Sequence, residues 1–129
     1  MKIAALIARI LLGLIFFVFG LNGFLFFIPA PPMTGFPQQF LAVIMASHFI
    51  LFVSGVEVIA GAMLLTNQYV PLAIVVLAAV LSNILVYHIT MQLSGIPLAL
   101  VATVLWFVVA WPLRAHFAPL FARKAEQEA

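Results

Sequence analysis

Long apolar stretches, separated by short polar or proline-rich breaks, are the feature that most limits what this chain can fold into. The first covers residues 3–28, and a second, residues 40–66, is divided at Ser47 and His48. Two more follow Pro71 and Pro97. A helix that crosses a bilayer needs about 20 apolar residues. Only 6% of the residues are charged, against about 25% in soluble domains. The sequence therefore predicts an all-α, polytopic membrane protein.

Prolines and polar residues set the predicted boundaries of these helices. The stretch PAPPMTGFPQQ, at 29–39, contains four prolines and a glycine and is expected to be a loop. Pro71 and Pro97 suit the first turn of a helix. The first apolar stretch is longer than the apolar core of a signal peptide, so we interpret it as a retained helix. We expect one domain over 1–129, an antiparallel bundle of four transmembrane helices, with helices at about 3–28, 48–66, 71–92 and 97–112, a short interfacial segment at about 38–47 and a tail at 113–129.

The positive charges predict the orientation of the chain. The five basic residues lie before or early in the first helix and after the fourth, at Lys2, Arg9, Arg114, Arg123 and Lys124, and the three connecting loops carry no charge. Positive residues stay on the cytoplasmic side of a membrane. Both termini are thus expected in the cytoplasm, with the lipid bilayer as the main partner. No basic stripe suggests nucleic acid.

A single acidic residue lies within the apolar stretches. Glu57 is at the centre of the second predicted span, close to the bilayer midplane. A charge at that depth costs roughly 3 kcal/mol on an insertion scale. Glu57 is therefore expected either to be protonated or to have a polar partner on a neighbouring helix.

Three residues compete as that partner. Asn83 comes first, because Glu57 and Asn83 are equally far in sequence from Val70, at the turn between the second and third spans, and should lie at matching depth. Arg9 is shallower, and an ion pair with Glu57 and snorkelling to the inner headgroups are both open for it. His88 lies farther outward than Asn83 and points elsewhere around the helix, so a polar residue near the interface and a proton relay are both open readings.

Small residues predict close helix packing. Ser54 and Gly61 share a stripe with Glu57, at spacings of three and four, and Gly13 and Gly20 share a face with Arg9 on the first helix. Such stripes let membrane helices approach closely, and glycine-rich faces would equally serve a homo-oligomer.

Other chemistry is limited by the residues present. Asn22 is expected to cap or hydrogen-bond at the outer end of the first helix, with a role in a site as the alternative. The chain has no cysteine, and no histidine or carboxylate pair has metal-ligand spacing, so no metal site is predicted. No cofactor motif is evident.

The chain resembles the DoxX family of small four-helix membrane proteins. The resemblance rests on the order of ARILLGLIFFVFGLNGF, a proline-rich loop, GVEVIAGAMLL, VPLA, NILVYH and GIPLAL, which together cover nearly the whole chain. It implies a location in the cytoplasmic membrane and makes Arg9, Asn22, Glu57, Asn83 and His88 the characteristic polar positions. Some relatives are linked to quinone-dependent thiosulfate oxidation or to oxidative-stress complexes.

Two classes of function follow from these observations. In the first, the chain is the membrane component of a quinone-linked redox or oxidative-stress system and binds a quinone or a redox partner protein. In the second, it is a non-catalytic binding, carrier or scaffold protein for a lipid-like small molecule. Whether the chain is an enzyme is left open by its sequence.

Overall fold

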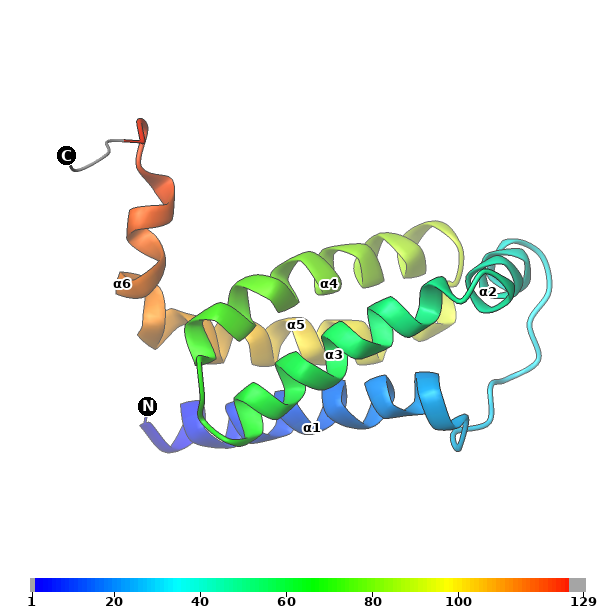
Figure 1. The fold of residues 1–129 in the computed structure, drawn as a ribbon, viewed down its shortest axis with the longest axis horizontal. Coiled ribbons are helices and arrows are strands. Elements are labelled where there is room, and N and C mark those ends of the chain that lie inside the picture. Colours follow the sequence, from blue (N-terminus) through cyan, green and yellow to red (C-terminus); the bar gives the residue numbers. More distant parts are fainter. Residues whose placement is uncertain (1, 126–129) are drawn as a thin grey trace.

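Four long helices form the body of the protein. A computed structural model describes residues 2–125, and within this part of the chain every regular element is helical. The long helices are α1 (Lys2–Leu25), α3 (Phe49–Leu65), α4 (Val70–Thr90) and α5 (Ile96–Ala110). They lie side by side, and the chain direction alternates from each one to the next (Figure 1). Each packs against two others, in the order α1, α3, α4, α5 and back to α1.

The length and apolar character of the helices agree with a membrane protein. Three segments are long and apolar enough to cross a membrane, namely Lys2–Leu25, Val70–Thr90 and Leu93–Phe121. A fourth crossing is counted if α2 (Phe36–Ala46) and α3 are taken together, although the two are bent by 88°. The outward faces carry large apolar side chains, such as Phe52 and Val104, which are more than 60% exposed. Such a surface suits acyl chains rather than water.

The predicted boundaries are close to those observed, except at the end of the first helix. α1 ends at Leu25 rather than near residue 28. Phe26 takes a left-handed conformation, with a φ of 53°, and its N–H donates to the carbonyl oxygen of Asn22. A left-handed residue just after a helix closes its last turn and redirects the chain, so the three apolar residues 26–28 belong to the loop.

The predicted interfacial segment is the short helix α2. Pro37 lies in its first turn, where a missing N–H costs nothing. His48, with a φ of 65°, separates α2 from α3. None of the residues of α2 is buried, and the helix lies across the end of the bundle farthest from both termini (Figure 1). The ring of Phe40 contacts that of Tyr87 on α4, with centroids 5.2 Å apart.

The tail begins with short helical turns that leave the bundle. They are η2 (Trp111–Leu113), α6 (Arg114–Phe117) and η3 (Ala118–Phe121), and in Figure 1 α6 points away from the long helices. The guanidinium of Arg114 lies 4.6 Å from the centre of the Trp111 ring and donates to the carbonyl oxygen of Trp111. An aromatic ring paired with a cation is typical of the level of the lipid headgroups.

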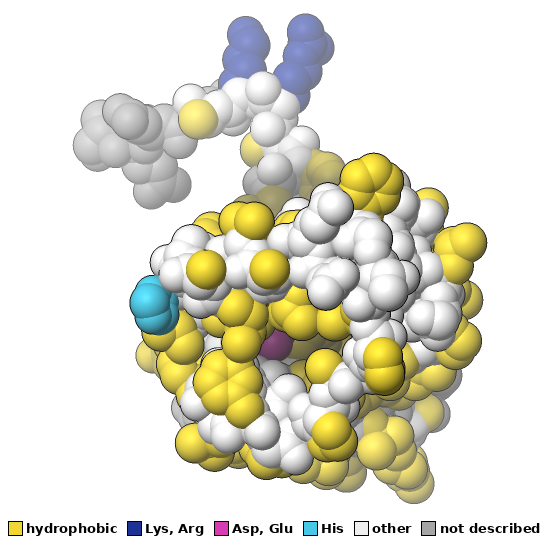
Figure 2. Space-filling view, turned by 90° about the vertical axis from the view of Figure 1, so that its right-hand side faces the viewer, with side chains coloured by type: hydrophobic (Ala, Val, Ile, Leu, Met, Phe, Trp, Pro, Cys, Tyr) yellow, Lys and Arg dark blue, Asp and Glu magenta, His cyan; other side chains and the backbone are white. Residues whose placement is uncertain are grey.

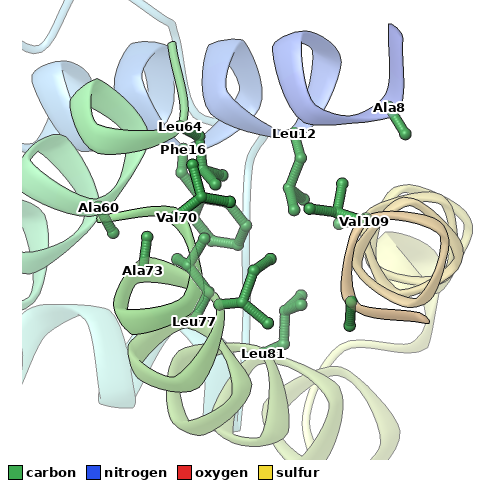
Figure 3. Close-up of a cluster of buried hydrophobic side chains, with 13 residues drawn as sticks. Ala8, Leu12, Phe16, Ala60, Leu64, Val70, Ala73, Leu77, Leu81 and Val109 are labelled. Carbon is green, nitrogen blue, oxygen red and sulfur yellow. The ribbon is translucent and has the colours of Figure 1, made fainter. Parts of the chain in front are cut away.

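The hydrophobic core fills one half of the bundle. Side chains from α1, α3, α4 and α5 converge in the half that carries the termini (Figure 3), and the largest fully buried ones are Leu12, Leu64, Ile74 and Leu77. Trp106 of α5 adds a polar link there, because its Nε1–H donates to the carbonyl oxygen of Ile74 over 2.9 Å. This half of the bundle is thus tightly packed.

Candidate functional site

The other half of the bundle contains no large buried side chain. It comprises residues 17–25, 49–57, 82–90 and 96–101, and the residues buried within it are all small: Gly20, Gly23, Ser54 and Ala99. Figure 2, which faces the α2 end, shows a hollow rimmed by apolar side chains. We call this feature the α2-end hollow. Glycine, serine and alanine cannot fill the space that leucine and phenylalanine fill in the opposite half.

An acidic side chain lies at the base of the α2-end hollow. Acidic atoms are visible deep within it in Figure 2, and Glu57 is the only acidic residue between 2 and 125. Glu57 lies eight residues from both ends of α3, which is about 12 Å along the helix axis. The side chain is half-buried. Its position at mid-depth is the one that the sequence predicts.

Glu57 packs against α1 rather than against α4. A Cβ placed on Gly20 of α1 would lie 3.0 Å from the Cβ of Glu57 and 2.9 Å from the backbone nitrogen of Val58. α1 and α3 form the most extensive contact between any two helices. The absence of a side chain at Gly20 therefore lets the backbone beside Glu57 come directly against α1.

The structure does not pair Glu57 with Asn83, which the sequence ranks first among the possible partners. Asn83 is exposed, and its amide donates to the carbonyl oxygen of Ala79, one turn earlier on its own helix, over 2.9 Å. The reason is that the stripe of small residues turns α3 toward α1, although α4 follows directly in sequence. Matching depth along a hairpin does not by itself bring two side chains together.

Arg9 contacts the backbone of α3 and not the side chain of Glu57, which is one of the two partners considered for it from the sequence. It forms no ion pair with Glu57, and its Nη1 donates to the carbonyl oxygen of Leu64 in the last turn of α3. The last carbonyl groups of a helix have no partner within the helix and carry a partial negative charge. Arg9 thus caps the end of α3, on the same face of α1 as Gly13 and Gly20.

His88 and Asn22 also lie apart from Glu57. The Nδ1 of His88 is 2.8 Å from the carbonyl oxygen of Ile84 and donates to it. A Cβ on Gly95 would lie 2.3 Å from the Nε2 of the same ring, which shows that the ring packs on the α4–α5 connection. The Oδ1 of Asn22 accepts from the N–H of Ile28 over 2.7 Å, the local role that the sequence predicts.

The four predicted packing residues come together between α1 and α3. A Cβ on Gly61 would lie 2.6 Å from the backbone nitrogen of Phe17 and 2.9 Å from the carbonyl oxygen of Gly13. Sequence reasoning missed Gly23, where a Cβ would collide with the Oγ of the buried Ser54. The spacing of three residues between Gly20 and Gly23 is the sequence pattern that could have identified Gly23 as a packing residue.

A cluster of polar and aromatic side chains around the α4–α5 connection was also missed. The hydroxyl of Tyr87 donates to the Oε1 of Gln92 over 3.0 Å, and its ring meets His88 edge to face, with centroids 4.9 Å apart. The contact between Phe40 and Tyr87 attaches α2 to this cluster. The sequence singles out His88, but it does not bring the other members of the cluster together, because they come from three separate segments.

Within residues 2–125, the carboxyl group of Glu57 forms no hydrogen bond and no ion pair. A carboxyl offers two oxygens as acceptors and, when protonated, an O–H donor. Within the described residues, no group of three or more histidine, cysteine or acidic side chains is placed to hold a metal ion. The site is therefore a single carboxyl at the base of an apolar hollow, suited to a molecule that supplies the missing hydrogen bond.

Comparison of the chain with family models, with curated proteins and with solved structures finds no match.

Proposed function

We propose that this chain is a DoxX-type membrane protein that binds the head group of a quinone in the α2-end hollow, as the membrane component of a quinone-linked redox or oxidative-stress system. The observation that carries the proposal is the carboxyl of Glu57, which has no protein partner within residues 2–125 and faces an apolar space. The protonated carboxyl donates a hydrogen bond to a quinone carbonyl, and its own carbonyl oxygen accepts one from a quinol hydroxyl. The choice of a quinone as the ligand rests on the resemblance to the DoxX family.

The chemistry of the hollow fits a head group of this kind. No side-chain nitrogen or oxygen within the described residues is both fully buried and without a hydrogen bond, so the carboxyl oxygens of Glu57 remain accessible to a ligand in the hollow. The apolar rim suits a ring and a prenyl tail. A partner protein supplies the electrons in this proposal, since the chain contains no cysteine and no cofactor motif.

Quinone binding is expected to depend on Glu57 and not on Asn83. Protein purified in mild detergent is extracted with solvent, and quinones are quantified by mass spectrometry against protein. We expect near-stoichiometric quinone in the unaltered chain and about tenfold less in Glu57→Leu, because one buried hydrogen bond is lost. Asn83→Leu is the matched control, since its amide bonds within its own helix, and it should change the quinone content by less than twofold.

The same measurement tests the second candidate, a carrier or scaffold for a lipid-like molecule. The apolar rim of the α2-end hollow, with a single polar anchor, favours it independently of any redox role. A lipid that replaces quinone in the extract and shows the same dependence on Glu57 would establish this second function. An extract without quinone, or an equal loss in Asn83→Leu, would contradict the quinone proposal.

We also propose that both termini lie in the cytoplasm and that the four helices cross the inner membrane as an antiparallel bundle. The start of α1 and α6 lie at the same end of the bundle (Figure 1). The positively charged residues are close to these two segments in the sequence. A fluorescent protein fused after Ala129 should fluoresce, whereas alkaline phosphatase at the same position should be inactive. An active phosphatase fusion would show that the C-terminus lies outside the cytoplasm and would contradict the proposed orientation.

A further inference from the structure

A second recess, separate from the α2-end hollow, lies at the opposite end of the bundle. It has a volume of about 280 Å³ and opens to the outside. It is formed where the start of α1, the α3–α4 turn and the end of α5 meet, an arrangement that Figure 1 shows at the end marked N. Its lining includes Lys2, Leu6, Arg9, Val109, Pro112 and Leu113. We call it the terminal recess.

Two cations line one wall of the terminal recess. Lys2 and Arg9 are seven residues apart on α1, which is two helical turns and places them on the same face. The contact between Arg9 and the carbonyl oxygen of Leu64 fixes the guanidinium at the end of α3. A guanidinium has five N–H donors, and this contact uses one nitrogen. The others remain available to an acceptor in the recess.

No carboxylate within residues 2–125 neutralises these cations. The only acidic residue there is Glu57, which lies two helical turns from Leu64, at the base of the other hollow. Val70, the first residue of α4, also lines the recess, so the partial positive charge at the start of that helix adds to the field. Lys2 and Arg9 therefore give the lining of the recess a positive charge within the described residues.

The walls of the recess place it at the level of the lipid headgroups. Leu6, Val109 and Leu113 provide apolar surface beside the two cations. Pro112 follows Trp111, whose exposed ring pairs with Arg114 in the manner of residues at a membrane interface. A ligand for this site combines an anionic group with an apolar part, which is the chemistry of an anionic phospholipid rather than of a free anion.

We propose that the terminal recess binds the phosphate of an anionic phospholipid, with Arg9 as a fixed hydrogen-bond donor and Lys2 as the second charge. Arginine binds a phosphate through two parallel N–H groups, whereas lysine acts as a point charge. The apolar wall receives the start of an acyl chain. This site is independent of the proposed quinone site, because the two lie at opposite ends of the bundle.

Lipid titration of the full chain tests this proposal. Protein in an uncharged detergent is titrated with dioleoyl phosphatidylglycerol or dioleoyl phosphatidylcholine, and bound lipid is counted by native mass spectrometry. We expect one phosphatidylglycerol to bind at least tenfold more tightly than phosphatidylcholine. Lys2→Gln should weaken that binding about fivefold, and Arg9→Lys should weaken it severalfold because the paired N–H geometry is lost.

The matched control is Arg114→Gln, which removes one positive charge at the same end of the bundle but outside the recess. It should change the affinity by less than twofold. Lys2 is exposed, so Lys2→Gln reports on the site even where an Arg9 variant fails to fold. Equal affinity for the two lipids, an equal loss in Arg114→Gln, or full displacement of the lipid by inorganic phosphate at the same concentration would overturn the proposal.

Discussion

Gly61→Ala is expected to lower the free energy of unfolding by about 2–3 kcal/mol, the upper range for overpacking a core. The new Cβ would lie 2.6 Å from the backbone nitrogen of Phe17. A flexible side chain can rotate away from such a clash, but a helix backbone cannot. α1 and α3 would have to separate along the contact that also includes Gly13. The thermal midpoint of the purified protein in detergent, together with the yield of folded protein, measures this loss.

Gly55→Ala is the matched control for this prediction. Gly55 lies on the same helix, and a Cβ there would meet only the Cζ of Phe24, at 3.9 Å. Alanine favours a helix over glycine by about 1 kcal/mol, so Gly55→Ala should leave the midpoint unchanged or raise it. Equal midpoints for the two variants would show that close approach at Gly61 does not hold α1 and α3 together.

Glu57→Leu is expected to raise stability while it removes the quinone binding that we propose. A carboxyl at mid-depth costs roughly 3 kcal/mol on an insertion scale, and leucine at that depth is favourable. No hydrogen bond is lost, since Glu57 has no partner within residues 2–125. The thermal midpoint in detergent, measured after quinone has been extracted from both proteins, should therefore be higher for the variant.

A destabilised Glu57→Leu variant would contradict this interpretation and would indicate a protein partner for the carboxyl in the membrane. Asn83→Leu again provides the comparison, because it places the same new side chain on an exposed position of α4. Stability gained by removing a polar group is a common sign that the group is retained for binding.

The sequence predicts the helices well because each boundary has a local cause. Pro37, Pro71 and Pro97 lie in the first turns of α2, α4 and α5, and the apolar runs between the breaks have the length that a bilayer demands. The end of α1 differs because the side chain and carbonyl of Asn22 organise a turn through Phe26. The hydropathy of residues 26–28 does not reveal that the amide side chain of Asn22 ends the helix before them.

The candidate site was predictable only in part, because two rules applied to α3 disagree about where Glu57 points. Proximity along the hairpin favours Asn83 on α4, whereas the stripe of Ser54, Glu57 and Gly61 favours the glycine face of α1. The structure follows the stripe, since close backbone contact needs small residues on both helices. Arg9 shares that glycine face, which is why it meets the end of α3.

The uneven filling of the bundle also determines what the protein can do to the permeability of its membrane. A molecule that enters from the α2 end meets Leu12, Leu64 and Leu77, none of which has any exposed surface. These side chains close the interior with hydrocarbon, through which an ion or a proton has no polar route. The buried core therefore separates the α2-end hollow from the opposite end of the bundle.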